Sequence, residues 1–190
     1  MTLILTAGPA EEPVTLAEAR AFMRLDDTSE DTLVTALITA ARATLEAETR
    51  RAFVTQHWRL LLDRFPGEGI VLPLAPVSAV AAISLVARTA PDETLDATLY
   101  ELDLGGEPPR IWGAEGGAWP KPKRRMAGIA IDFTAGYGGA EAVPQALKQA
   151  VLMLVAHWFE TRLPVAFGDA GADIPMTVAA LIAPYRRFRL

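Results

Sequence analysis

PQALKQAVLMLVAHWFETR, residues 144–162, is the stretch around which this sequence organises. It opens on Pro144, which is favourable at the first position of a helix because proline has no N–H to leave unsatisfied there. Between Ala150 and Phe159 the apolar residues cover nearly the whole helical circumference. A helix that is apolar all round lies in a protein interior, so the stretch predicts a buried central helix that ends near Arg162.

Three further helices are predicted around it. Thr15 and Glu18 form a capping box at the start of a short helix. A longer amphipathic helix of about five to six turns follows from residue 28, with Arg42 on its outer face. Its predicted buried stripe contains Leu33, Leu37, Ala41 and Leu45, with Val34 and Ile38 beside it. A last short helix, 176–183, is predicted after Pro175.

The residues between the helical regions have a different sequence pattern. From 57 to 134, short apolar runs are separated by proline and glycine, which favours strands over helices. Two runs alternate apolar and polar or small residues as a half-buried sheet does, namely Trp58, Leu60, Leu62 and Ile129, Ile131, Phe133. Residues 105–125 hold many glycines and prolines and are predicted to form a long loop.

The order of these elements predicts an α+β fold with a mainly helical core and a β-rich insertion. We expect a single domain over residues 1–190. Its helical core is predicted at about 14–52 and 143–187, its β-rich insertion at about 55–135, and a C-terminal tail at 184–190. Two helices therefore come from each end of the chain.

The amino-acid composition narrows the classes of function that the chain can have. About half of the residues are hydrophobic (51%) and the mean hydropathy is +0.23, so apolar surface can remain for a partner. The net charge of −5 argues against a protein that grips DNA through its phosphates. The absence of cysteine excludes disulfides, thiolate metal sites and cysteine nucleophiles. No apolar stretch approaches the ~20 residues of a membrane span, and no signal peptide is predicted.

No motif predicts catalysis, a cofactor or a metal. His57 and His157 lack the companion ligands that a metal site requires, and structural roles are favoured for both. The acidic residues at 26–31 do not fit a calcium-binding loop. The glycines at 135–139 lack the lysine and hydroxyl residue of a phosphate-binding loop, so they are interpreted as a turn after a strand.

Two basic clusters remain as candidate interaction sites. One lies in the predicted loop and contains Lys121, Lys123, Arg124 and Arg125, which are candidates for contact with a partner or with DNA. The other is the C-terminal segment Tyr185, Arg186, Arg187, Phe188, Arg189 and Leu190. Arginine beside aromatic residues at a chain end suits docking into another protein.

Several stretches, taken in order, resemble the head–tail connector (adaptor, or head-completion) proteins of tailed phages. They are VTLAEARAFMRLDD, SEDTLVTALITAARATLEAETRRAFVTQHW, LPLAPVSAVAAISL, IDFTAGYGGAEAVPQALKQAVLMLVAHWFETR and VAALIAPYRRFRL, and together they span about residue 14 to the end. The abundance of alanine and the excess of arginine over lysine suit a prophage or a gene transfer agent.

The resemblance implies a non-enzymatic structural subunit with no cofactor. Members form a ring, expected to be dodecameric, that docks beneath the portal protein and joins the head to stopper or tail-terminator proteins. DNA passes through the lumen without sequence-specific binding, and no membrane is involved. The implied location is the neck of the particle, with the host cytoplasm before assembly. On this basis the segment 185–190 becomes the candidate for portal docking.

Two alternatives stay open on the sequence. One is a small soluble enzyme or ligand-binding subunit with a site near the 105–125 loop. The other is a DNA-binding module that uses the two basic clusters.

Overall fold

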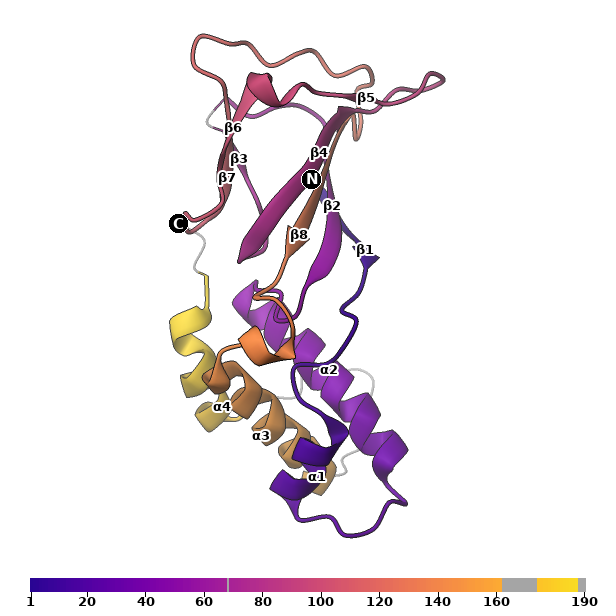
Figure 1. Ribbon diagram of the computed structural model, residues 1–190, viewed down its shortest axis with the longest axis vertical. Coiled ribbons are helices and arrows are strands. Elements are labelled where there is room, and N and C mark those ends of the chain that lie inside the picture. The colour runs from indigo at the N-terminus through magenta and orange to yellow at the C-terminus, as the bar shows by residue number, and fades with distance from the viewer. Residues whose placement is uncertain (68, 162–173, 188–190) are drawn as a thin grey trace. The chain divides into compact units, whose positions relative to one another are not determined.

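The computed structural model describes residues 1–67, 69–161 and 174–187 (Figure 1). The chain divides into two compact units. The first, here called the β unit, consists of Met1–Ala10 and Thr55–Tyr137, and the second, the helical unit, consists of Glu11–Val54 and Gly138–Leu190. Each unit has its own buried core.

The larger sheet of the β unit has five antiparallel strands in the order β1-β2-β8-β4-β5. Its strands are β1 (Thr2–Ala7), β2 (Gln56–Leu62), β8 (Ile129–Ala135), β4 (Val77–Leu85) and β5 (Glu93–Thr94). Figure 1 shows β8 between β2 and β4, with β1 on the far side of β2. β1 and β5 are therefore the edges of this sheet.

One face of the larger sheet forms the core of the β unit. Leu60, Ile131 and Ile83 lie opposite one another on three neighbouring strands, and each has no exposed surface. Ile129 and Phe133 flank Ile131 on the same face of β8 and are also buried, which confirms the alternation predicted for this strand. On the other face Arg59 and Asp132 form a salt bridge of 2.7 Å between Nε and Oδ1.

The smaller sheet has three antiparallel strands in the order β3-β7-β6. They are β3 (Ile70–Val71), β7 (Arg110–Gly113) and β6 (Tyr100–Asp103), preceded by a 3₁₀ turn at Ala97–Leu99. Ile70 and Ile111 lie opposite each other and are buried. β7 lies within the stretch 105–125, so that stretch is not one continuous loop.

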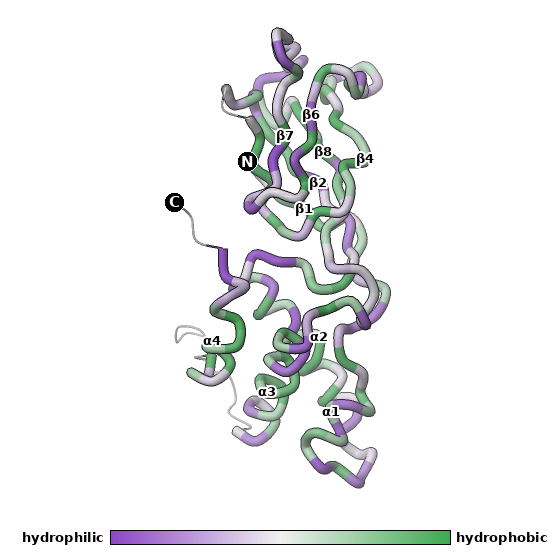
Figure 2. Tube along the Cα trace, turned by 60° about the vertical axis from the view of Figure 1, so that its left-hand side comes forward, coloured by the Kyte–Doolittle hydropathy of each residue, from purple (hydrophilic) through white to green (hydrophobic). Residues whose placement is uncertain are grey.

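The helical unit contains α1 (Leu16–Met23), α2 (Asp31–Thr49), α3 (Gln145–Thr161) and α4 (Met176–Ile182). Figure 2 shows hydrophobic residues along much of α3. Its buried residues are Leu147, Ala150, Val151, Leu154 and Val155. None of the helices in the described part of the chain is long and apolar enough to cross a membrane.

The predicted starts of α1, α3 and α4 are confirmed, whereas α2 begins at Asp31 and not at residue 28. Thr15 Oγ1 accepts a hydrogen bond from Glu18 N (3.1 Å), and Thr15 N donates one to Glu18 Oε2 (2.6 Å), which is the reciprocal capping box. α3 begins directly after Pro144. The predicted end of α3 near Arg162 lies outside the described residues.

The expectation of a mainly helical core is wrong. Within the described residues the fold is α+β and β-rich, with eight strands in two antiparallel sheets and four α-helices. Sequence reasoning missed β1, which pairs with β2 and brings the N-terminal residues into the β unit. Because this unit buries its own large side chains, including Phe133 and Leu60, it has a core independent of the helices.

The predicted buried stripe of α2 is also displaced. Leu33 is 41% exposed, whereas Val34, Ile38 and Leu45 are buried. Arg42, expected on the outer face, is buried as well. The carboxylates of Glu12 and Glu46 pair with the Arg42 guanidinium, and this pairing offsets the cost of burying its charge.

Candidate functional site

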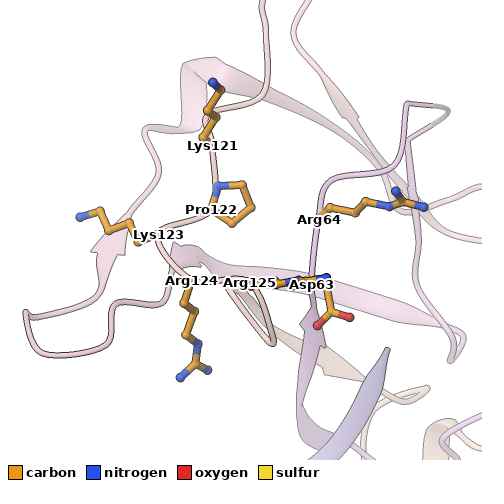
Figure 3. Close-up of a pocket in the computed structure, with 7 residues that line it drawn as sticks. All are labelled: Asp63, Arg64, Lys121, Pro122, Lys123, Arg124 and Arg125. Atoms are coloured by element: carbon orange, nitrogen blue, oxygen red, sulfur yellow. The ribbon is translucent and has the colours of Figure 1, made fainter.

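The first predicted cluster lies at an open hollow of about 760 Å³ in the β unit (Figure 3). Its lining residues are Asp63, Arg64, Lys121, Pro122, Lys123, Arg124 and Arg125, here called the basic hollow. The structure thus brings the four predicted loop residues together with Arg64, which follows β2. Sequence reasoning missed Arg64, because nothing local shows that the segment after β2 meets the loop.

Backbone contacts hold the basic loop in place. Arg124 Nε donates to Ala127 O (2.9 Å), and Ala127 N donates to Asp63 Oδ1 (2.7 Å). Gly128 follows, and a Cβ built there would lie 2.4 Å from Arg124 O. Only glycine fits this close approach, so the loop closes tightly before β8. Asp63 therefore has a structural role in the basic hollow.

The remaining cations give the basic hollow its charge. Lys123 Nζ lies 2.6 Å from Glu93 Oε2, in a pair whose side chains are 38% and 58% exposed. In the part of the chain that the structure describes, Lys121, Arg125 and Arg64 form no ion pair. Figure 3 shows the side chains of Lys121, Lys123 and Arg124 pointing in different directions. Diverging, exposed cations suit an extended acidic surface better than a small molecule.

The second predicted cluster lies in the helical unit, after α4. Arg51 Nε donates to Tyr185 O (2.8 Å), and Arg186 forms a salt bridge of 2.8 Å with Glu48 Oε2. Glu48 belongs to α2 and Arg51 follows it, so the start of the segment is anchored to the C-terminal end of that helix. Tyr185, Arg186 and Arg187 are half-buried.

Phe188, Arg189 and Leu190, the other half of this predicted cluster, lie outside the described residues. The two clusters belong to different units, and each is assembled from residues of its own unit.

The histidines and acidic residues do not form a metal centre in the described residues. His57 Nδ1 lies 3.1 Å from Thr134 Oγ1 across the sheet. Asp27 Oδ1 accepts a hydrogen bond from Ser29 N, and this bond lowers the pKa of the Asp27 carboxyl. Asp31 Oδ2 forms a salt bridge of 3.1 Å with Arg20 Nη1, so this acid connects α2 to α1.

An ionic network that was not predicted lies in the helical unit. Arg42 Nε donates to Glu12 Oε2 (2.7 Å), and its Nη1 donates to Glu46 Oε2 (2.7 Å). Burial acts to lower the pKa of Arg42, but the hydrogen bond and charge of Glu12 and the charge of Glu46 outweigh it and raise that pKa. Glu46 Oε1 also accepts from Phe53 N (2.7 Å). The network is structural, because each group is engaged in holding backbone or helix.

The Gly-rich turn after β8 is as predicted. Gly136 and Gly138 have φ angles of 133° and 136°, in the region that favours glycine. Gly136 N donates to Pro76 O (2.9 Å), so the turn ends the strand and binds no external group through that amide.

Comparison with known proteins finds a family that this chain matches. Residues 12–188 match the family described as "HCP: Head completion protein". No curated protein sequence matches this one.

Three solved structures are similar over the whole chain. One is titled "Neck of empty GTA particle computed with C6 symmetry", with 30% identity and a TM-score of 0.81. A second is "Virion of native gene transfer agent (GTA) particle", with 30% identity and a TM-score of 0.80. The third is "Neck of native GTA particle computed with C12 symmetry", with 30% identity and a TM-score of 0.77. Each match covers 100% of this chain and 97% of the other.

Proposed function

This chain belongs to the head completion protein family, and we propose that it is a structural adaptor in the neck of a phage-like particle of the gene-transfer-agent kind. Adaptors of this type connect surfaces and transform no substrate, so the chain is not an enzyme. The alternative of a small enzyme or ligand-binding subunit with a site near 105–125 loses its basis. The basic hollow in that region is open, and its side chains diverge.

The observation that carries this proposal is the similarity to chains in particle necks, at a TM-score of 0.81 and with nearly complete coverage of both chains. Those necks were computed with C6 and C12 symmetry. Cyclic symmetry needs contacts between two different surfaces of each copy that close on themselves. The symmetry of those necks supports a homo-oligomeric ring of this chain, for which we propose twelve copies.

In this proposal the two units act together, with residues 1–190 as one connector domain that joins a portal protein on one side to stopper or tail-terminator proteins on the other. DNA passes through the ring without sequence-specific contacts, and the net charge of −5 supports weak holding of the DNA. The chain resides in the particle neck, and in the host cytoplasm before assembly.

The two basic clusters receive separate roles. The segment 185–190 is proposed to dock on the portal, supported by half-buried Tyr185 and Arg187 beside the anchored Arg186. The basic hollow, with Lys121, Lys123, Arg124 and Arg125, is proposed to contact DNA or an acidic partner surface. The alternative of a free-standing DNA-binding module has less support, because the protein as a whole is acidic.

Deletion of the gene in a producing cell tests the proposal. We expect heads without attached tails, and restoration of joined particles by a plasmid copy carrying an epitope tag. Electron microscopy with an antibody to the tag should label the neck. Normal joined particles in the deletion strain, or label elsewhere than at the neck, would overturn the proposal.

A further inference from the structure

β1 leaves one edge of the larger sheet open. It pairs only with β2, and its outer backbone groups bond to no other part of the chain that the structure describes. Its sequence, TLILTA, contains no charge and no proline. Ile4 and Leu5, neighbours that point to opposite faces, are 41% and 47% exposed. Natural proteins usually protect such an edge with charges, proline or a covering element, so an unprotected one is a template for another strand.

The opposite edge of the same sheet is also largely open. β5 pairs only with Ser84 and Leu85 of β4, and Ile83 O accepts a hydrogen bond from Leu95 N (2.8 Å). Residues 77–82 have no strand on that side among the described residues, and their sequence VSAVAA carries no charge. Ser78, Ala79 and Ala81 are exposed. Small side chains leave space for another strand to approach.

The two open edges are matched in length and direction. β1 has six residues, as many as the open part of β4. The strands β1, β2, β8 and β4 are successively antiparallel, so β1 and β4 run in opposite directions. A copy related by rotation about an axis roughly along the strands keeps these directions. Its β1 would therefore meet β4 of the first copy as an antiparallel partner.

We propose that β1 of one copy pairs with residues 77–82 of β4 in the next copy, so that the larger sheets continue from subunit to subunit around the ring. This inference rests on the proposed ring and names the surfaces that build it. The contact is heterologous, as a ring requires, because the two edges are different surfaces of the same chain. β5 limits the register, since it occupies the end of β4 at Ser84.

Irregularities in β4 fit this arrangement. The pairing of β4 with β8 skips Ser78 and Ala81, which are bulged residues. Bulges increase strand twist and bend a sheet, as a sheet that follows a closed ring must do. They also disfavour indefinite edge-to-edge growth, which separates a closed assembly from a fibre.

Engineered disulfides test the pairing directly, because the wild-type chain contains no cysteine. Ile4→Cys or Leu5→Cys is combined with a cysteine at each of residues 78–82, and particles carrying each variant are oxidised. Within one copy these positions lie three strand spacings apart, about 14 Å, so a bridge inside the chain is impossible. For one register we expect a ladder of covalent multimers on non-reducing gels, absent from each single variant.

A second experiment uses charge instead of cross-linking. Ile4→Lys with Leu5→Lys is expected to weaken association between copies at least about tenfold and leave the circular dichroism spectrum unchanged. Met126→Lys is the matched control, since Met126 is 77% exposed in the same unit and outside both edges.

The outcomes separate this inference from the proposed function. If the chain is present in particle necks but no register gives covalent multimers, strand pairing between copies is wrong. The proposed adaptor function is then unaffected. A β1 cysteine that cross-links to a different protein also overturns it. Absence of the chain from particle necks overturns both.

Discussion

Arg42 and Glu12 are joined by a hydrogen bond of 2.7 Å between Nε and Oε2 across thirty positions of sequence. This contact ties the segment before α1 to the middle of α2, and Glu46 completes the pairing of the guanidinium. The Arg42 side chain is only 11% exposed. A buried charge depends on such partners, which makes the network a sensitive point of the helical unit.

Replacing Arg42 by methionine should lower the free energy of unfolding by about 3 kcal/mol, because Glu12 and Glu46 then lose their countercharge in a partly buried site. Urea denaturation followed by circular dichroism measures the change. Arg88→Met is the control, as Arg88 is exposed and takes part in no salt bridge of the described residues, and it should change little. Equal effects of the two substitutions would contradict a stabilising role for the network.

Glu18 should make stability depend on pH. The backbone hydrogen bond from Thr15 N, followed by that from its hydroxyl, lowers the pKa of the Glu18 carboxyl. A pKa lower in the folded than in the unfolded state means that the charged form stabilises the fold. This contribution is present above the unfolded value, about 4.3, and is lost as the pH falls through the folded value.

Glu18→Gln should therefore flatten the acid limb of the stability curve measured by denaturation between pH 7 and pH 3. Thr15→Ala should also lower stability at pH 7, by about 1 kcal/mol, through loss of the cap. An acid limb of Glu18→Gln with the slope of the wild type would show that the carboxylate has no such role.

Ile131→Ala should lower the free energy of unfolding by about 3 kcal/mol. Ile131 is completely buried between Leu60 and Ile83, so truncation leaves a cavity in the centre of the larger sheet. Chemical denaturation measures the loss, and Met126→Ala, at a site 77% exposed, should cost less than about 1 kcal/mol. A small effect of Ile131→Ala would argue that the β unit lacks a core of its own.

Arg186→Ala combined with Arg187→Ala should reduce the attachment of this chain to portal-containing heads and preserve the fold. The Arg186–Glu48 pair is about a third exposed or more on both sides, so its loss should cost at most about 1 kcal/mol. Glu48→Gln breaks the same ion pair and keeps both arginines. The Glu48→Gln variant should therefore attach normally in a pull-down with purified heads. An attachment defect equal to that of the double variant would show that loss of the ion pair, and not loss of a portal contact, causes the defect.

Lys121→Gln with Arg125→Gln should weaken binding of DNA at low salt without changing the melting temperature. Neither side chain forms an ion pair within the described residues, so the fold does not depend on them. Each phosphate contact that is lost should reduce the slope of log K against log salt by about 0.9. An unchanged slope, measured by fluorescence anisotropy with duplex DNA, would assign the basic hollow to a protein partner.

Features that depend on near neighbours could be predicted from the sequence. The capping box of Thr15 and Glu18, the start of α3 after Pro144 and the alternation along β8 all appear as expected. Each depends on spacings of two to four residues, which the chain carries with it wherever it folds. The ordered motifs likewise led to the family.

Features that depend on distant partners could not be predicted from the sequence. TLILTA carried a signal for a strand, a short uncharged apolar run followed by Gly8-Pro9, but its place beside β2 depends on residues fifty or more positions away. The basic hollow includes Arg64 from a segment distant in sequence, and the buried Arg42 is paired with Glu12, thirty positions away.

Spacings between near neighbours thus predicted the capped start of α1, the start of α3 and the alternation along β8. Three features could be read only from the folded chain, namely the excess of strands over helices in its described part, the burial of Arg42, and the open edges of β1 and β4. This difference arises because local spacing selects the conformation of a segment, whereas burial and strand pairing depend on which distant segments it meets.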